Sequence, residues 1–279
     1  MKCFSVSVLG VCFGAAGFAL RLLQNRTGFE PDTGLPIPGN IPAMALPALL
    51  VLAAVAVYLL ACRCLPEKAE KRYFGELFRL EDKGGLSAVL AGGCIMAASG
   101  VLELLDTVGG SAAAVSADGM EVVAVGAGNG GSGVAIGVLS AAAGICLAAG
   151  AILCRKENPQ PQLLLAVPVC LLVRLILVYR LRSTDPVLAD YYLEILGLMF
   201  LILAVYRLSG FAVQMGRPRL FAFYAGVTAV LALTMLPDGV SSAVLLMLGG
   251  ALALTGFQWM LQADAAVRPS DGRTDTEAE

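Results

Sequence analysis

The sequence contains no histidine, and charged residues make up only 14% of its 279 positions. Without histidine the chain cannot form histidine-ligated haem or zinc sites, an HExxH protease, a phosphorelay histidine or a serine–histidine–acid triad. Soluble globular domains carry about 25% charged residues, so this chain has too few to cover a water-facing surface. The net charge of −2 gives no electrostatic basis for binding nucleic acid, and we expect no such partner.

Hydrophobic residues make up 58% of the chain. They gather in runs of about 20 residues, which match the roughly 30 Å hydrocarbon core of a bilayer when helical. Because backbone groups in lipid must be satisfied internally, each run is predicted to be a helix. The expected fold is therefore an all-α integral membrane protein, a bundle of about eight transmembrane helices within residues 1–264. The predicted spans are 4–23, 43–62, 86–105, 133–153, 163–182, 188–208, 218–236 and 240–261, with a loop at 107–132 and a disordered cytoplasmic tail at 265–279.

The distribution of lysine and arginine predicts the orientation of the bundle. With the N-terminus in the cytoplasm, fourteen of the nineteen basic residues lie inside and Arg174 lies within a span. The four that lie outside are Arg21, Arg26, Arg180 and Arg182. We therefore expect both termini to be cytoplasmic in a bacterial cytoplasmic membrane. The first span has the basic start and apolar run of a signal peptide, but it lacks a small-residue cleavage site, which favours a retained helix.

Ionisable residues in the outer half of the predicted bundle are the main anomaly of the sequence. Arg174 lies about twelve residues into the fifth span, between apolar neighbours. An arginine at this depth costs at least about 2.5–3.5 kcal/mol, so it should pair with an acid or face water. Glu103 and Glu194 lie at suitable depths to pair with it. The residues form either a structural ion pair or a polar cavity for a solute or ions, and the candidate cluster is Arg21, Glu103, Asp106, Arg174, Asp190 and Glu194.

Other motifs favour ordinary structural roles. Small residues at helical spacing, from Gly133 to Ala148 and from Gly93 to Gly100, predict closely packed helices. Residues 122–133 match GxGxxG, but a membrane span follows and no acidic residue lies about 20 positions on, so we expect no cofactor. The cysteines near the inner face do not have a zinc spacing and are expected to be free thiols; they are Cys3, Cys62, Cys64 and Cys154.

Two loops and a possible repeat leave alternatives open. Residues 66–83 predict an amphipathic helix on the cytoplasmic membrane face, either a packed connector or a docking site for a partner. The proline-rich outer loop at 24–41 is either a rigid turn or a cover over an outer vestibule. Matching residues between spans one, two and four and spans five, six and eight suggest a parallel four-plus-four duplication, in which Arg21 and Arg174 are equivalent.

The leading functional hypothesis is a transporter or permease-like carrier for a small polar or anionic solute. The alternative is a non-catalytic membrane subunit, sensor or assembly protein that docks a cytoplasmic or membrane protein partner through residues 66–83. An enzyme is disfavoured, because the sequence offers neither a nucleophile–base set nor clustered aspartates for a metal. A cavity that joins both halves of the chain would favour transport, whereas an exposed apolar face on 66–83 would favour a subunit.

Overall fold

The computed structural model describes residues 5–28, 37, 39–66, 74, 78, 83–113, 130–153, 161–182 and 188–267. Within these ranges the regular structure is helical throughout, without a strand, as the sequence predicts. Eight helices are long and apolar enough to cross a membrane. They are α1 (Ser5–Thr27), α2 (Ile41–Cys64), α4 (Lys83–Ala113), α5 (Gly130–Leu153), α6 (Pro161–Arg182), α7 (Leu188–Ala212), α8 (Pro218–Thr234) and α9 (Ser242–Val267), with a short 3-10 helix, η1 (Leu236–Asp238), between α8 and α9.

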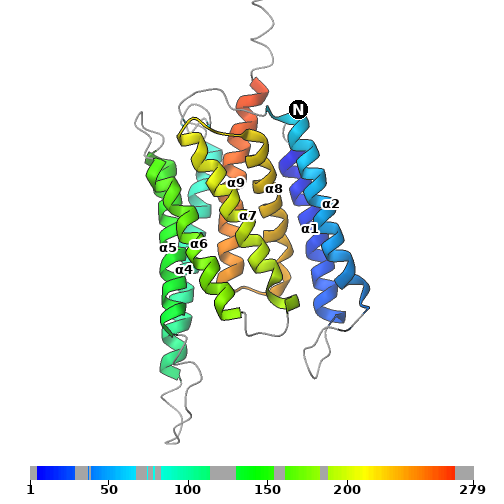
Figure 1. The fold of residues 1–279 in the computed structure, drawn as a ribbon, viewed down its shortest axis with the longest axis vertical. Helices are drawn as coiled ribbons and strands as arrows, with labels where there is room; N and C mark the ends of the chain where they lie inside the picture. Colours follow the sequence, from blue (N-terminus) through cyan, green and yellow to red (C-terminus); the bar gives the residue numbers. More distant parts are fainter. Residues whose placement is uncertain are drawn as a thin grey trace, which may run out of the picture.

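Successive helices run in opposite directions along the bundle. The start of α1 and the end of α9 therefore lie at the same end, at the top of Figure 1. We call this the terminal end of the bundle, and we call the end that carries Thr27 and η1 the opposite end. An even number of crossings requires this arrangement.

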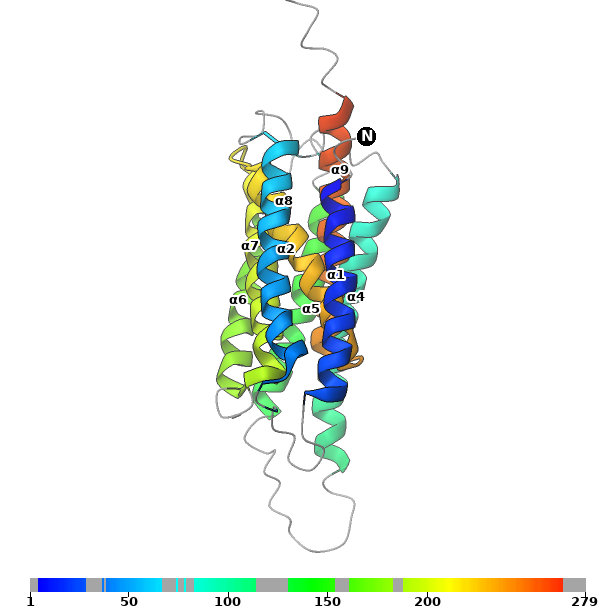
Figure 2. The ribbon, with the colours of Figure 1, turned by 90° about the vertical axis from the view of Figure 1, so that its right-hand side faces the viewer.

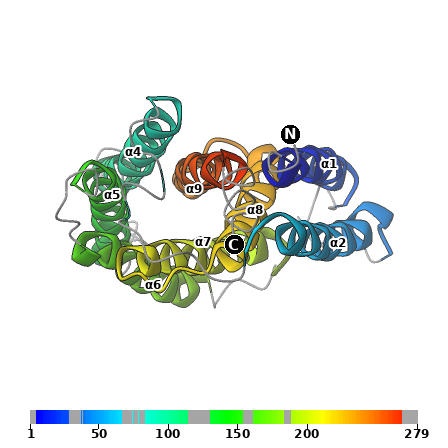
Figure 3. The ribbon, with the colours of Figure 1, turned by 90° about the horizontal axis from the view of Figure 1, so that it is seen from above.

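The first four helices divide into two pairs that flank the last four. Helices α1 and α2 pack on each other and on α8, whereas α4 and α5 pack on each other and on α9 and α6, respectively. Figure 3 shows the two pairs at opposite sides of the bundle, with α6 to α9 between them. The second four helices instead contact one another in chain order. The two halves of the chain are therefore packed differently.

Glycines permit the closest helix contacts. A Cβ atom on Gly144 of α5 would lie 2.6 Å from the carbonyl oxygen of Gly93 of α4. On the other side of α4, a Cβ atom on Gly249 of α9 would lie 2.7 Å from the carbonyl oxygen of Gly92. Backbones this close leave no room for a side chain. The prediction that the small-residue stripes of the third and fourth spans serve packing is confirmed.

Several predicted helix ends differ from those in the structure. The loop expected at 107–132 is shorter, because α4 continues to Ala113 and α5 begins at Gly130. These two ends project past the neighbouring helices (Figures 1 and 2). Likewise, α9 continues to Val267, into the predicted tail. Segments of Gly, Ala and Ser are weak helix signals in isolation, and packing or continuity with a stable helix extends them. The glycine-rich match lies outside the described residues except for its last positions.

Five phenylalanine rings fill the core at the terminal end, and we call them the aromatic seal. Phe211 lies in the last turn of α7, Phe221 in the first turn of α8 and Phe257 in the second half of α9. Phe74 and Phe78 join them, and the ring centroid of Phe78 lies 5.3 Å from that of Phe211 and 5.4 Å from that of Phe257. All five side chains are at most 2% exposed. Most of these contacts are edge-to-face, a favoured geometry for aromatic pairs.

Two residues of the seal belong to the segment 66–83, which is predicted to be an amphipathic helix. Of the apolar residues of this segment, the structure describes only Phe74 and Phe78. The amide of Phe78 donates to the carbonyl oxygen of Phe74 at 3.1 Å, which is one turn of helix. Both rings point into the bundle and not to its surface. These two residues therefore form part of a packed connector, while the other predicted apolar positions, Tyr73, Leu77 and Leu80, lie outside the described residues.

Candidate functional site

The turn between α8 and α9 is built by local sequence at the opposite end of the bundle. Pro237 lies within η1, and Gly239 has a φ of 95°, a conformation that glycine adopts without strain. The hydroxyl of Ser241 accepts a hydrogen bond from the amide of Val244 at 3.3 Å and so caps α9. This tight turn holds the Asp238 side chain at the end of α1.

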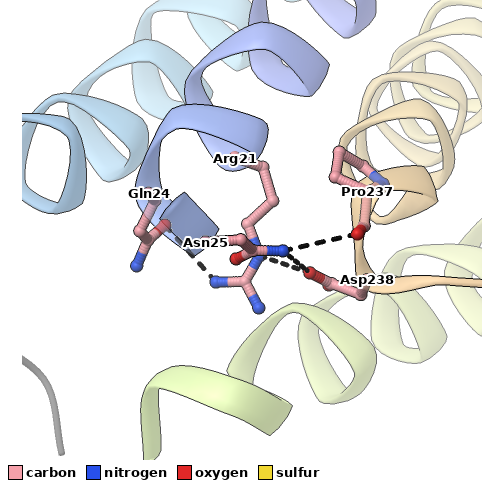
Figure 4. Close-up of polar contacts among 5 residues, drawn as sticks. All are labelled: Arg21, Gln24, Asn25, Pro237 and Asp238. Atoms are coloured by element: carbon pink, nitrogen blue, oxygen red, sulfur yellow. Dashed lines mark hydrogen bonds and ion pairs between the residues drawn. The ribbon is translucent and has the colours of Figure 1, made fainter. Parts of the chain in front are cut away.

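Arg21 and Asp238 form an ion pair that joins α1 to η1. The Nε atom of Arg21 donates to Oδ1 of Asp238 at 2.7 Å, and its Nη1 donates to the Gln24 amide oxygen at 3.3 Å. Asn25 donates to the same Asp238 oxygen at 2.9 Å (Figure 4). The Arg21 side chain is 3% exposed and that of Asp238 23%. The charge of Arg21 is therefore matched by a carboxylate that reaches the solvent.

Arg174 lies deeper and is held by neutral groups. Its Nη1 donates to the hydroxyl of Ser140 and to the carbonyl oxygen of Ile136, the latter at 3.5 Å. The Ser140 hydroxyl itself donates to the same carbonyl at 2.7 Å. Within the part of the chain that the structure describes, Nε has no hydrogen-bond partner and no carboxylate lies within salt-bridge distance. The residue is 2% exposed, so its charge is buried without an ion pair.

Two carboxylates lie near Arg174 without forming an ion pair with it. Glu103 of α4 and Glu194 of α7 line the same cavity as the Arg174 guanidinium. Oε2 of Glu103 accepts a hydrogen bond from the hydroxyl of Ser242, at the start of α9. Glu194 is 8% exposed. The three helices α4, α6 and α7 thus direct opposite charges towards one region.

These side chains line a cavity of about 650 Å³. Both halves of the chain contribute, the first through α1, α4 and α5 and the second through α6, α7, η1 and α9. Asn25, Asp238 and Ser241 lie at its exposed rim, so the cavity reaches the surface at the opposite end of the bundle. Arg174 lies eight residues before the end of α6, which at 1.5 Å per residue places it about 12 Å along the helix from that end. The charged lining residues are Arg21, Glu103, Arg174, Glu194 and Asp238.

The structure brings together four of the six residues proposed from the sequence. Arg21, Glu103, Arg174 and Glu194 all line the cavity. Asp106 is exposed and is not among the lining residues. It lies three residues after Glu103 on α4, but the exposure of its side chain separates it from the cavity. Asp190 lies in the first turn of α7, and its side chain is outside the described part of the structure.

Sequence reasoning missed several polar residues of the site, among them Asp238, Ser140 and Ser242. Asp238 was assigned only to a short loop, although an aspartate between a proline and a glycine outside the seventh span was a usable signal. Ser140 was assigned to a packing stripe, and the structure shows that it also binds Arg174. Ser242, which binds Glu103, carried no signal, because serines at span ends are common.

In the described residues no group of three or more His, Cys, Asp or Glu side chains is arranged to hold a metal ion. Neither Cys62 nor Cys64 forms a disulfide with another described cysteine, while Cys3 and Cys154 lie outside the described residues. No protein-family model, curated protein or solved structure matches this chain.

Proposed function

We propose that this protein is a multi-pass membrane carrier that moves a small polar solute through the bundle. The observation that carries the proposal is the cavity, in which a buried guanidinium and two carboxylates from different helices face a common space. Such intramembrane charges are expensive and usually mark a substrate or ion pathway. Lining residues from both halves are what we expect where two parts of a carrier move against each other.

The charge distribution supports an orientation with the cavity open to the outside. By their position in the sequence, most basic residues belong to segments that precede, follow or connect helices at the terminal end, and the positive-inside rule assigns that end to the cytoplasm. In this orientation, Thr33→Cys and Ser116→Cys variants of a cysteine-free chain react with an impermeant thiol reagent from outside, whereas an Ala69→Cys variant does not. Reaction of Ala69→Cys from outside would show that the orientation is the reverse of the one proposed.

The packing at the terminal end supports the proposal that the cavity is closed towards the inside. The aromatic seal fills the core there. Gln258 directly follows Phe257 of the seal, and Gln262 lies about one helical turn further along α9. Both glutamines are fully buried, and no amide atom of either has a hydrogen-bond partner in the described residues. An unsatisfied buried polar group costs about 1–3 kcal/mol. A second state in which water reaches these amides would explain why the chain carries them.

The alternative of a docking subunit has less support. It requires residues 66–83 to offer an apolar face to a partner. Phe74 and Phe78 instead contact the bundle core. These two side chains are part of the internal packing and unavailable for docking in this state.

A labelling experiment tests the carrier without knowledge of the solute. Three single-cysteine variants of a cysteine-free chain are treated with an impermeant maleimide from either side of oriented proteoliposomes. They are Ser242→Cys in the cavity, Gln258→Cys beside the seal, and Val240→Cys, whose position is 87% exposed at the surface. A carrier opens its cavity first to one side of the membrane and then to the other. Ser242→Cys should therefore react from both sides, and Gln258→Cys should react from the inside when the seal opens. Val240→Cys should react from outside only, and this variant controls for leakage.

The opposite outcome would overturn the proposal. If Ser242→Cys reacts from outside only, like Val240→Cys, and Gln258→Cys never reacts, the cavity is a static outer vestibule. The protein would then be a receptor or a structural subunit.

The four-plus-four duplication remains a prediction. One arginine from each half, Arg21 and Arg174, lines the common cavity, but the two halves pack differently. Superposition of residues 1–155 on 156–264 tests it, because the second span must fall on the sixth.

A further inference from the structure

We infer that the cavity binds a small zwitterion, with its carboxylate on Arg174 and its ammonium group on Glu103. This inference rests on the proposed function, since it names the class of solute that the carrier would move. It also makes a prediction about binding alone, which can be tested on the purified protein.

Arg174 has the features of a carboxylate-binding site. Its guanidinium is buried and lines the cavity, and only Nη1 is engaged by Ser140 and Ile136. Its other nitrogen atoms, Nε and Nη2, donate to no protein group within the described residues. Guanidinium groups bind carboxylates through a fork of N–H donors. The contacts to Ser140 and Ile136 fix the side chain and leave Nη2 available for a ligand.

Glu103 supplies the opposite charge in the same cavity. Ser242 donates to its Oε2, and Oε1 accepts no hydrogen bond from the described residues. The side chain is partly exposed and lines the same cavity as Arg174. An ammonium group is a compact cation that a single carboxylate oxygen can receive.

The balance of charges selects a zwitterion over a simple ion. Apart from the ion pair of Arg21 with Asp238, the guanidinium of Arg174 and the carboxylate of Glu103 line the same cavity. A simple anion on Arg174 would face the carboxylate of Glu103, and a simple cation on Glu103 would face the guanidinium. Like charges repel strongly in a cavity of low dielectric constant. A solute with separated positive and negative groups avoids both penalties.

The test measures thermal unfolding of the full chain in detergent with four probes at equal ionic strength. The probes are acetate, ethylamine, glycine and γ-aminobutyrate. Acetate carries only the anionic group, ethylamine only the cationic group, and the two amino acids carry both at different separations. We expect at least one amino acid to raise the melting temperature in a saturable way, more than acetate and ethylamine together.

Variants assign each end of the zwitterion to its residue. Glu103→Gln should weaken the apparent affinity for the active amino acid by about tenfold or more, the worth of a charged hydrogen bond. It should not weaken the response to acetate and should strengthen it, because a carboxylate that repels acetate is neutralised. Arg174→Gln should abolish both responses, and Arg174→Lys, which keeps the charge, should restore part of them. Asp106→Asn is the matched control on α4, because its side chain lies outside the cavity, and it should behave like the parent.

The possible failures are distinguishable. If acetate stabilises the protein as well as the amino acids do, and Glu103→Gln has no effect, the zwitterion inference is wrong while an anion carrier remains. If ethylamine alone matches the amino acids, the ligand is a cation and the inference is again wrong. If no probe gives a saturable shift, the inference fails, and the two-sided labelling of Ser242→Cys then decides whether the carrier proposal fails with it.

Discussion

At the terminal end of the bundle five phenylalanine rings pack into a closed core, whereas at the opposite end two arginines and three carboxylates surround a cavity of about 650 Å³. The same helices, α7 and α9, contribute to both regions. At the closed end the five rings stabilise the bundle through contacts that need no polar partner. At the open end the stabilisation comes from a few directed polar contacts around a space that the chain leaves unfilled.

This difference teaches how one bundle combines a tightly packed core with a polar cavity. Ring packing is collectively strong and tolerates no voids. The cavity must instead keep each charge paired, hydrogen-bonded or near an opposite charge. If the two ends have these distinct roles, substitutions at the seal should affect mainly stability, and substitutions of Arg174 and Glu103 in the cavity should affect mainly ligand response.

The largest expected effect on stability is at the centre of the seal. Phe78→Ala should lower the free energy of unfolding by about 3–5 kcal/mol, because the ring leaves a void that its neighbours cannot fill. Reversible unfolding in mixed detergent micelles measures the change. Phe18→Ala is the matched control on α1, since Phe18 is 37% exposed and should lose much less. Equal losses in the two variants would show that the seal is not a stabilising core.

A smaller effect is expected at the ion pair that ties α1 to η1. Arg21→Met should cost about 1.5–3 kcal/mol, towards the lower value because Asp238 reaches water. A double-mutant cycle with Asp238→Asn measures the coupling, and the double variant should regain part of the loss. Additive losses in the double variant would show that the pair contributes nothing as a unit.

The unsatisfied amide groups at the terminal end predict that a substitution there raises the free energy of unfolding. Gln258→Met keeps the size of the side chain and removes unsatisfied polar atoms, so it should raise the free energy of unfolding by about 1 kcal/mol. In the labelling experiment it should also slow the reaction of Ser242→Cys from the inside, because the closed state is favoured. The control is Gln162→Met on the exposed face of α6. A destabilised Gln258→Met would mean that the amide has a partner in the closed state.

The smallest effect is expected at Asp106. Its side chain is exposed on α4 and does not line the cavity. Asp106→Asn should therefore change stability by less than about 0.5 kcal/mol, measured under the same unfolding conditions. A loss as large as that of Arg21→Met would place Asp106 in the polar network and would extend the cavity towards the exposed face of α4.

The apolar runs were sufficient to predict eight helices, and the small-residue stripes were sufficient to predict close packing. The isolated charge of Arg174 was sufficient to indicate where the candidate site lies. Each of these signals is local, because it depends on composition and spacing within one helix. The sequence thus determined the all-helical architecture, the approximate length of each span and the high cost of burying Arg174.

Only the tertiary structure decided which residues meet. Asp238 reaches Arg21 across 217 positions, Ser140 binds Arg174 from a neighbouring helix, and Phe78 packs against rings from α7, α8 and α9. It also decided that Asp106 faces outward while Glu103, three residues earlier, faces the cavity. Partner choice depends on how helices pack and rotate relative to one another, and hydrophobicity cannot specify this when almost every face of a helix is apolar.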